Sequence, residues 1–351
     1  MAGLFTGFLI AFVISLLMTP FVKKLAFRIG AVDRPNARKV HSRTMPRMGG
    51  LAIFLAFTIT ILLIEPITKP IIGLLAGGAL ILFMGIADDI VGISPRVKLL
   101  GQILVAGLLV MFGVKISFLT NPFGGEMFSL SIIGIPLTIF WIVGVTNALN
   151  LVDGLDGLAG GLAAIASLTL AVIGWSNDQM LIVVPAVILS ASIFGFLKYN
   201  FYPAKIFMGD SGSLFLGYML AGLSVIGLTK GAAVVSVFVP ILILGIPIFD
   251  TLYAIVRRFI NNQPIFEADR GHIHHRLLAI GLSHRQTVVA IYGIASLLGA
   301  SAIVLTFLTT AQAFVMFVGI SVLILIGANR INAMSAKTVQ RVVSDKANIG
   351  M

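Results

Sequence analysis

The sequence predicts an all-α, polytopic integral membrane protein with about eleven transmembrane helices. Its 351 residues are 58% hydrophobic and only 11% charged, with a mean hydropathy of +1.08, whereas soluble domains carry about 25% charged residues. One hydrophobic core could not bury so much apolar side chain, but a bilayer solvates it if every spanning backbone is hydrogen-bonded internally as helix. We therefore expect helices throughout and no soluble domain.

The candidate spans are apolar windows of about 17–25 residues, the length that crosses about 30 Å of hydrocarbon. The first window runs directly into Lys23 and Lys24, with no basic region before it and no small-residue cleavage site, so we expect a retained span rather than a signal peptide. Residues 1–328 are expected to form one transmembrane domain. Residues 329–351 are expected to form a basic tail that is partly disordered or lies near anionic lipid. The windows are 3–22, 48–65, 70–87, 98–114, 131–147, 157–175, 180–198, 213–228, 232–256, 286–306 and 312–328.

The distribution of basic residues predicts the orientation. An N-terminus outside leaves only Lys69, Lys115 and Lys230, of 24 Lys and Arg, on the outer side. Cytoplasmic loops carry the excess of Lys and Arg, so the N-terminus is expected outside and the C-terminus in the cytoplasm. The same bias explains the net charge of +11 without a nucleic-acid partner. The absence of cysteine excludes a thiolate nucleophile or thiolate metal site.

The acidic residues point to one site on the inner side. Of 13 Asp and Glu, only Glu65, Glu126 and Asp178 fall on the outer side. A carboxylate at membrane depth costs about 2.5–3.5 kcal/mol, so the others should face a cavity and be paired or metal-bound. Most of these inner acidic residues lie in four segments of the chain.

The first segment is Asp88-Asp89, at the inner end of the third window. Adjacent carboxylates repel each other, so the pair suits a general base beside a metal or an incoming phosphate, although a solvated helix end is the alternative. Lys98 follows and is the cation we single out, because it begins an otherwise apolar helix. Many of the basic residues that crowd the first loop must serve as topology determinants.

The second segment holds Asn147, Asn150, Asp153 and Asp156, which recur at every third residue. On a helix this spacing keeps them near one face. Asp156 would then cap a helix that opens at Gly157, whose free N–H groups form an anion site. A polar stripe between packed helices is the alternative.

The third segment, residues 199–213, contains Asn200 and Asp210. Gly209 and Gly212 allow close backbone approach, and Asp210 offers the hard oxygen ligand that Mg²⁺ prefers. Ser211 or Ser213 is expected to start the eighth helix, for which a plain helix cap is the alternative.

The fourth segment is a long loop that combines three histidines with flanking charges. Imidazole and guanidinium donors suit phosphate and nucleotide oxygens, while a transition-metal site or a merely solvated loop remain alternatives. Its residues are Glu267, Asp269, Arg270, His272, His274, His275 and Arg276.

Together these segments resemble, over nearly the whole chain, the polyprenyl-phosphate N-acetylhexosamine-1-phosphate transferases. The resemblance rests on an ordered set of motifs on the predicted inner side. They are the Gly30–His41 segment, Pro46-Arg47-Met48-Gly49-Gly50, Asp88-Asp89, Asn147–Leu158, Phe207-Met208-Gly209-Asp210, Pro247-Ile248-Phe249-Asp250 and His272–Leu277.

The resemblance implies an active site on the cytoplasmic face, Mg²⁺ as cofactor with Mn²⁺ as a substitute, and release of UMP. By position, Asn150 and Asp210 match metal ligands, Asp88 matches a proposed base, and Lys98 matches a phosphate contact. The expected catalytic residues are Asp88, Asp89, Asp153 and Asp156. The expected substrate-binding residues are Lys39, Lys98, Asn147, Asn200, Arg270, His272, His274 and His275.

The expected reaction transfers GlcNAc-1-phosphate from UDP-GlcNAc to undecaprenyl phosphate in the bacterial cytoplasmic membrane. It would start wall teichoic acid or a related envelope polysaccharide, and a homodimer is one possible assembly. The alternatives are a phospho-MurNAc-pentapeptide transferase, a CDP-alcohol phosphotransferase and a secondary transporter. A transporter would need its polar groups near the bilayer midplane rather than at inner helix ends.

Overall fold

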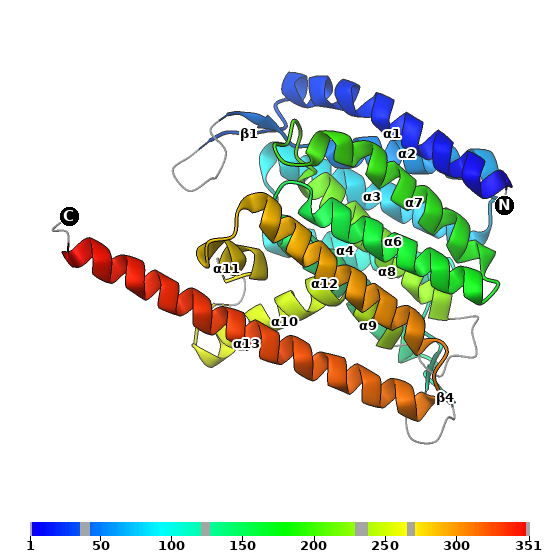
Figure 1. The fold of residues 1–351 in the computed structure, drawn as a ribbon. Coiled ribbons are helices and arrows are strands. Elements are labelled where there is room, and N and C mark those ends of the chain that lie inside the picture. The colour runs from blue at the N-terminus through cyan, green and yellow to red at the C-terminus, as the bar shows by residue number, and fades with distance from the viewer. Residues whose placement is uncertain (1, 36–42, 121–126, 229–237, 265–270, 349–351) are drawn as a thin grey trace.

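The computed structural model describes residues 2–35, 43–120, 127–228, 238–264 and 271–348. Within them the chain is almost entirely helical, as expected from the need to satisfy backbone hydrogen bonds in lipid (Figure 1). The helices are α1 (Ala2–Ile29), α2 (Gly49–Ile64), α3 (Lys69–Val91), α4 (Pro95–Met111), α5 (Gly134–Val152), α6 (Leu158–Ser176), α7 (Met180–Asn200), α8 (Gly209–Leu228), α9 (Phe238–Ile243), α10 (Gly245–Ile260), α11 (Ile273–Ala279), α12 (His284–Leu305) and α13 (Thr310–Asn348).

The described part confirms a multi-pass membrane protein. Eight of its helices, α1, α3, α5, α6, α7, α8, α12 and α13, are long and apolar enough to cross a bilayer, and α2 is a shorter apolar helix. The count of eleven spans and the outside position of the N-terminus stay predictions.

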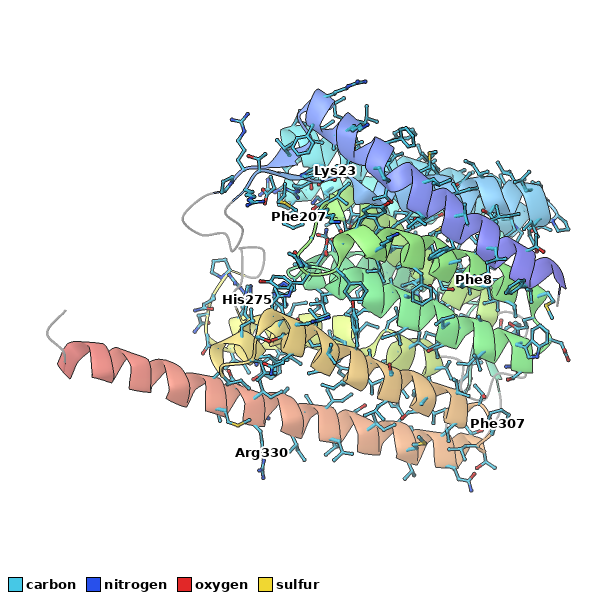
Figure 2. All side chains as sticks on the ribbon, turned by 45° about the horizontal axis from the view of Figure 1, so that its top comes forward. Phe8, Lys23, Phe207, His275, Phe307 and Arg330 are labelled. Atoms are coloured by element: carbon cyan, nitrogen blue, oxygen red, sulfur yellow. The ribbon has the colours of Figure 1, made fainter. Side chains whose placement is uncertain are left out.

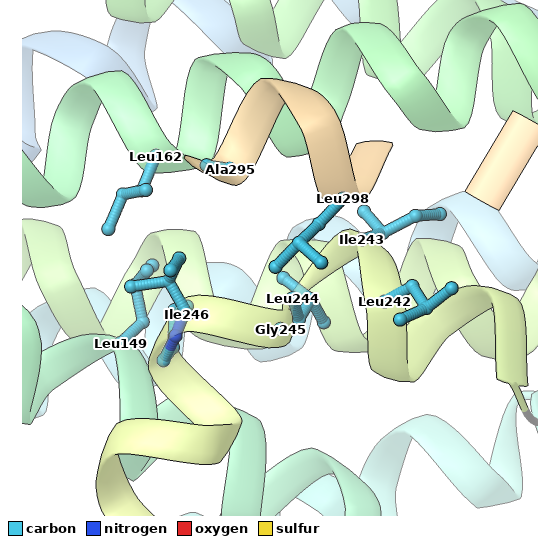
Figure 3. A pocket seen from close by; sticks show the side chains of 10 residues that line it. Leu149, Leu162, Leu242, Ile243, Leu244, Gly245, Ile246, Ala295 and Leu298 are labelled. Atoms are coloured by element: carbon cyan, nitrogen blue, oxygen red, sulfur yellow. The ribbon is translucent and has the colours of Figure 1, made fainter. Parts of the chain in front are cut away.

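One expectation about the helices is wrong. The window 232–256 is not one helix, because its described part divides at Leu244 into α9 and α10 (Figure 3). Pro247 has no N–H, so the helical bond to the carbonyl of Ile243 cannot form, and the chain restarts as α10. A small apolar cavity between α5, α6 and α12 adjoins this break. Helix α13 continues to Asn348, and the assignment of residues 329–351 as a basic tail near anionic lipid stays a prediction.

Helix α8 forms the centre of the bundle and is almost completely buried. It packs against α3, α5 and α2, and the Tyr218 hydroxyl donates to the Gly73 carbonyl of α3 at 2.9 Å. Glycines make this packing close: a Cβ at Gly50 of α2 would lie 2.2 Å from the Gly212 nitrogen, and one at Gly85 of α3 would lie 2.5 Å from the Ser211 Cα. The start of α8 is thereby fixed against two neighbouring helices.

The short strands lie at opposite ends of the bundle. The hairpin β1 (Val32–Asp33) and β2 (Met45–Pro46) lies at the same end as α11, while β3 (Phe118–Thr120) and β4 (Met127–Ser129) lie at the other end (Figure 1). A bridge between Arg47 and Phe207 ties the first hairpin to the segment before α8. The loops that hold the predicted polar site therefore gather at one end of the molecule.

Candidate active site

A cavity of about 720 Å³ opens at the end of the bundle that carries the β1–β2 hairpin and α11. Ligand sites of small molecules commonly enclose about 300–1,000 Å³. Phe207 and His275, which both line the cavity, lie at this end of the helices in Figure 2. Its polar lining comes from Asp33, Arg43, Arg47, Asn150, Asp153, Asp156, Asn200, Tyr202, Asp210, His275 and His284.

The first turn of α8 places Asp210 between two cations. One carboxylate oxygen, Oδ2, is 2.5 Å from the Lys98 ammonium of α4, and the other is 3.3 Å from the Arg47 guanidinium. The same Lys98 nitrogen lies 2.5 Å from Asp88 at the end of α3. The structure thus brings together Asp88, Lys98 and Asp210 as predicted, although Asp210 lies 112 residues after Lys98.

Asp89 has a different environment from Asp88. Its side chain is fully buried, accepts hydrogen bonds from the backbone N–H groups of Asp210 (3.0 Å) and Ser211 (3.1 Å), and lies 3.2 Å from Arg47. A carboxylate at a helix N-terminus stabilises the helix by hydrogen bonding and by its charge. This geometry gives Asp89 the task of holding the start of α8, and with it Asp210.

The loop between α5 and α6 does not have the predicted conformation. The helix ends at Val152, so Asp153 and Asp156 lie in a turn rather than on a continued helical face. The expected cap is also wrong, because α6 has Gly157 at its N-cap and makes no side-chain cap hydrogen bond. Asp156 instead accepts from the Ala204 N–H at 2.9 Å and so fixes the loop after α7. Gly157, with φ +79°, allows this turn because it has no Cβ.

Asp153 is the titratable group that its surroundings alter most in this loop. Burial, followed by the nearby Asp210 carboxylate, raises the pKa of Asp153 to about 7. Asn150, at the end of α5, donates from its amide nitrogen to the Ser213 hydroxyl at 2.8 Å. This bond uses the amide nitrogen and leaves the carbonyl oxygen of Asn150 as an acceptor in the cavity that Asp153 and Asp210 also line.

Two predicted substrate-binding asparagines mainly join parts of the fold. Asn147 forms a reciprocal amide pair with Gln102 of α4, at 2.6 and 3.2 Å, and does not line the cavity. Asn200 borders the cavity but is buried, accepting from Gly157 N–H at 3.1 Å and donating to the Ile206 carbonyl at 3.0 Å. Lys39 and Arg270 lie outside the described residues.

The histidine segment forms the short helix α11. His272 lies 2.8 Å from Asp250 of α10, whose other oxygen accepts from the Ile273 N–H at 2.9 Å. His274 packs against Gly154, where a Cβ would lie only 2.3 Å from its Nε2 atom. Burial, with the adjacent His275 as the next cause, lowers the pKa of His274 to about 3. His275 alone of the three lines the cavity.

Several cavity residues are not among the predicted site residues. Arg47, which contacts Asp89 and Asp210, lies within the Pro46–Gly50 motif. His284 stacks on Tyr202 with ring centroids 4.5 Å apart and accepts from the Asp156 N–H at 3.2 Å. No local pattern marks His284, because it begins a helix 128 residues away from Asp156.

The oxygen donors fit a magnesium ion better than a softer metal. Asn150, Asp153 and Asp210 face one cavity, and Mg²⁺ prefers carboxylate and carbonyl oxygens, usually with only one or two protein carboxylates and substrate phosphates completing its shell. Within the described residues no group of three or more His, Cys, Asp or Glu is arranged to hold a metal by itself. The arrangement therefore suits an ion that is bound together with a phosphorylated substrate.

Comparison with known proteins agrees with this chemistry. Residues 71–228 match the family described as glycosyl transferase family 4. The chain is 50% identical, over 84% of its length and 84% of the relative, to the Bacillus subtilis protein named "Probable undecaprenyl-phosphate N-acetylglucosaminyl 1-phosphate transferase".

More distant relatives carry related names. Identity is 39% to the decaprenyl-phosphate N-acetylglucosaminephosphotransferase of Mycobacterium tuberculosis H37Rv, over 81% of this chain and 78% of the relative. It is 30% to the undecaprenyl-phosphate alpha-N-acetylglucosaminyl 1-phosphate transferase of Escherichia coli K12, over 84% of this chain and 82% of the relative. The chain therefore belongs to glycosyl transferase family 4, and within it to the polyprenyl-phosphate N-acetylhexosamine-1-phosphate transferases.

Proposed function

We propose that the protein transfers GlcNAc-1-phosphate from UDP-GlcNAc to undecaprenyl phosphate, giving undecaprenyl-diphospho-GlcNAc and UMP. The observation that carries the proposal is the convergence of Asp88, Lys98, Asn150 and Asp210 at one end of a membrane bundle. A sequence identity of 50% with a relative named for this reaction supports GlcNAc as the sugar and undecaprenyl phosphate as the lipid acceptor.

The cations and carboxylates suit transfer of a phosphosugar between two phosphates. An oxygen of the lipid phosphate attacks the β-phosphorus of UDP-GlcNAc, and the bond from that phosphorus to the oxygen of UMP breaks. Lys98 holds the incoming phosphate, and Asp88 beside it accepts a proton if the lipid phosphate arrives protonated. Arg47 and the N-terminus of α8 supply further positive potential at the same place.

Asn150 and Asp210 would hold Mg²⁺ with the donor diphosphate. When bound, the ion neutralises charge on the diphosphate and on the leaving UMP, which is the main electrostatic requirement of phosphoryl transfer. Asp153 lines the same cavity as these two residues. Asp156 and Asn200 hold the surrounding loops through hydrogen bonds to the backbone.

The location of the cavity supports a lipid acceptor. It lies at the end of the apolar helices, where a polyprenyl phosphate would place its headgroup. A transporter site would instead lie at mid-depth. We place this end at the cytoplasmic face of the bacterial plasma membrane, because the basic loops lie on that side. The product would serve wall teichoic acid or a related envelope polysaccharide.

The test is a transfer assay with purified protein, UDP-GlcNAc and undecaprenyl phosphate. We expect UMP and lipid-linked GlcNAc in equal amounts, with no UMP when undecaprenol replaces its phosphate. Chelation of Mg²⁺ should stop both products, and added Mg²⁺ should restore them. Release of UMP without lipid-linked sugar would contradict the proposed acceptor.

A further inference from the structure

Another cavity, of about 50 Å³, lies between α10, α11, α12 and α13 and shares no residue with the cavity of about 720 Å³ that forms the candidate active site. Most of its wall is apolar, including Phe249, Leu298 and Ile324. Its charged residues are Asp250 and Arg276. We call this cavity the α10–α13 pocket.

Among the residues that the structure describes, Arg276 is a buried cation without an anionic partner. Its residue exposure is 7%, its guanidinium carbon lies 4.6 Å over the Tyr253 ring, and its Nη2 atom is buried without a hydrogen bond. The carboxylate in the same pocket, Asp250, is occupied by His272 (2.8 Å) and by the Ile273 N–H (2.9 Å). An uncompensated buried charge costs several kcal/mol, so this position favours a bound anion.

The pocket lies at the depth of a lipid headgroup. On α13, the apolar run through Leu325 ends at Ala328, and Asn329 and Arg330 follow. The α13 residues that line the pocket, Ile324, Leu325, Ala328 and Ile331, span this change. Tyr253, beneath Arg276, accepts from the Asn332 side chain at 3.3 Å. The pocket therefore borders both the hydrocarbon and the polar interface.

We propose that the α10–α13 pocket binds the phosphate of an anionic phospholipid through Arg276, with the acyl chains along the exposed apolar face of α13. A guanidinium group can donate two parallel hydrogen bonds to two oxygens of one phosphate, a bidentate contact. Arg257 and Arg258 in the last turn of α10 favour a headgroup with net negative charge. Such a lipid would hold the face of α11 opposite the catalytic cavity, since His275 lines that cavity and Arg276 lines the pocket.

Binding to the purified full-length protein in neutral detergent tests this site without reference to catalysis. Native mass spectrometry would measure the apparent Kd for phosphatidylglycerol, with phosphatidylcholine and inorganic phosphate as comparison ligands. We expect Arg276→Gln to weaken phosphatidylglycerol binding at least about tenfold, because the charge-assisted contact is lost. The matched control is Arg330→Gln, whose side chain points away from the bundle in Figure 2 and which should change the Kd less than about twofold.

A second variant tests the pocket without removing the charge. Ala328→Phe fills the α10–α13 pocket and should weaken binding as Arg276→Gln does, which keeps the test decisive if Arg276→Gln does not fold. Phosphatidylglycerol binding that is unchanged in either folded variant would overturn the site. Binding of inorganic phosphate as tight as that of the lipid, and equally dependent on Arg276, would overturn the lipid as its ligand.

Discussion

At the scale of single residues, one ammonium group, that of Lys98, lies 2.5 Å from carboxylate oxygens of both Asp88 and Asp210. This ammonium group can release one carboxylate and bind an incoming phosphate at a small cost in free energy, because one anionic partner replaces another. Asp89, in contrast, has no free oxygen for a substrate, since the start of α8 and Arg47 occupy both of them. The two adjacent aspartates therefore have different tasks in our proposal.

The proposed metal ligands give the first prediction. Asp210→Ala and Asn150→Ala should each reduce transfer at least about 10²-fold, comparable to the loss of one important transition-state contact. The measurement is the initial rate of lipid-linked GlcNAc formation at fixed Mg²⁺, on protein shown to be folded by its thermal unfolding. Asp178→Asn, at the opposite end of the bundle, is the control and should keep its rate. A near-normal rate for Asp210→Ala would place the metal elsewhere.

At the scale of elements, contacts between the loops decide the form of the site. The loop after α5 is held by Ala204 and His284, and α11 is held by Asp250 and by packing of His274 against Gly154. Two of these contacts, from His284 to Asp156 and from His274 to Gly154, join segments more than a hundred residues apart. They explain how short loops can hold substrate groups in fixed positions.

The packing of α11 gives the second prediction. Gly154→Ala would place a methyl group 2.3 Å from Nε2 of His274, so the His274 ring or the turn that carries residue 154 must shift. Because a displacement of about 1 Å can cost as much as 10²-fold in rate, we expect a large fall in kcat. Gly144→Ala, in α5, adds a Cβ with no atom within 4 Å and is the matched control. Equal kcat values for the two variants would show that α11 does not support catalysis.

Elements with strong apolar patterns could be predicted from the sequence, and turns could not. Hydropathy located most helices, and the positions of Asp88, Lys98 and Asp210 at helix ends followed from it. Every-third-residue spacing predicts a helix through Asp156, but α5 ends at Val152 and Gly157 takes the positive φ of the turn that follows. The break at Pro247 was likewise hidden in an apolar run. Partners such as His284 depend on tertiary contacts that no local pattern contains.

At the scale of the whole molecule, the polar loops lie at one end of a bundle whose central helix, α8, is held by closely packed glycines. The outer helices α1 and α13 expose large apolar side chains that suit contact with lipid. This separation places charged chemistry at a membrane surface while the helices provide a rigid support.

The orientation gives the third prediction, and the absence of native cysteine makes it directly testable. Ser94→Cys, before α4, should react with an impermeant thiol reagent only after the membrane is opened. Asn177→Cys, after α6, should react in intact cells. Labelling in the reverse pattern would place the catalytic cavity outside the cell and exclude a cytoplasmic UDP-sugar donor.

The central claim is that the donor is UDP-N-acetylglucosamine, and competition between donors tests it most directly. Purified protein would receive labelled UDP-N-acetylglucosamine and undecaprenyl phosphate, with an excess of unlabelled UDP-MurNAc-pentapeptide. We expect the yield of labelled lipid to be unaffected and UMP to be released one for one with it. Use of the pentapeptide donor with the higher kcat/KM would contradict the proposed substrate, while the helical bundle and the phosphosugar chemistry would stand.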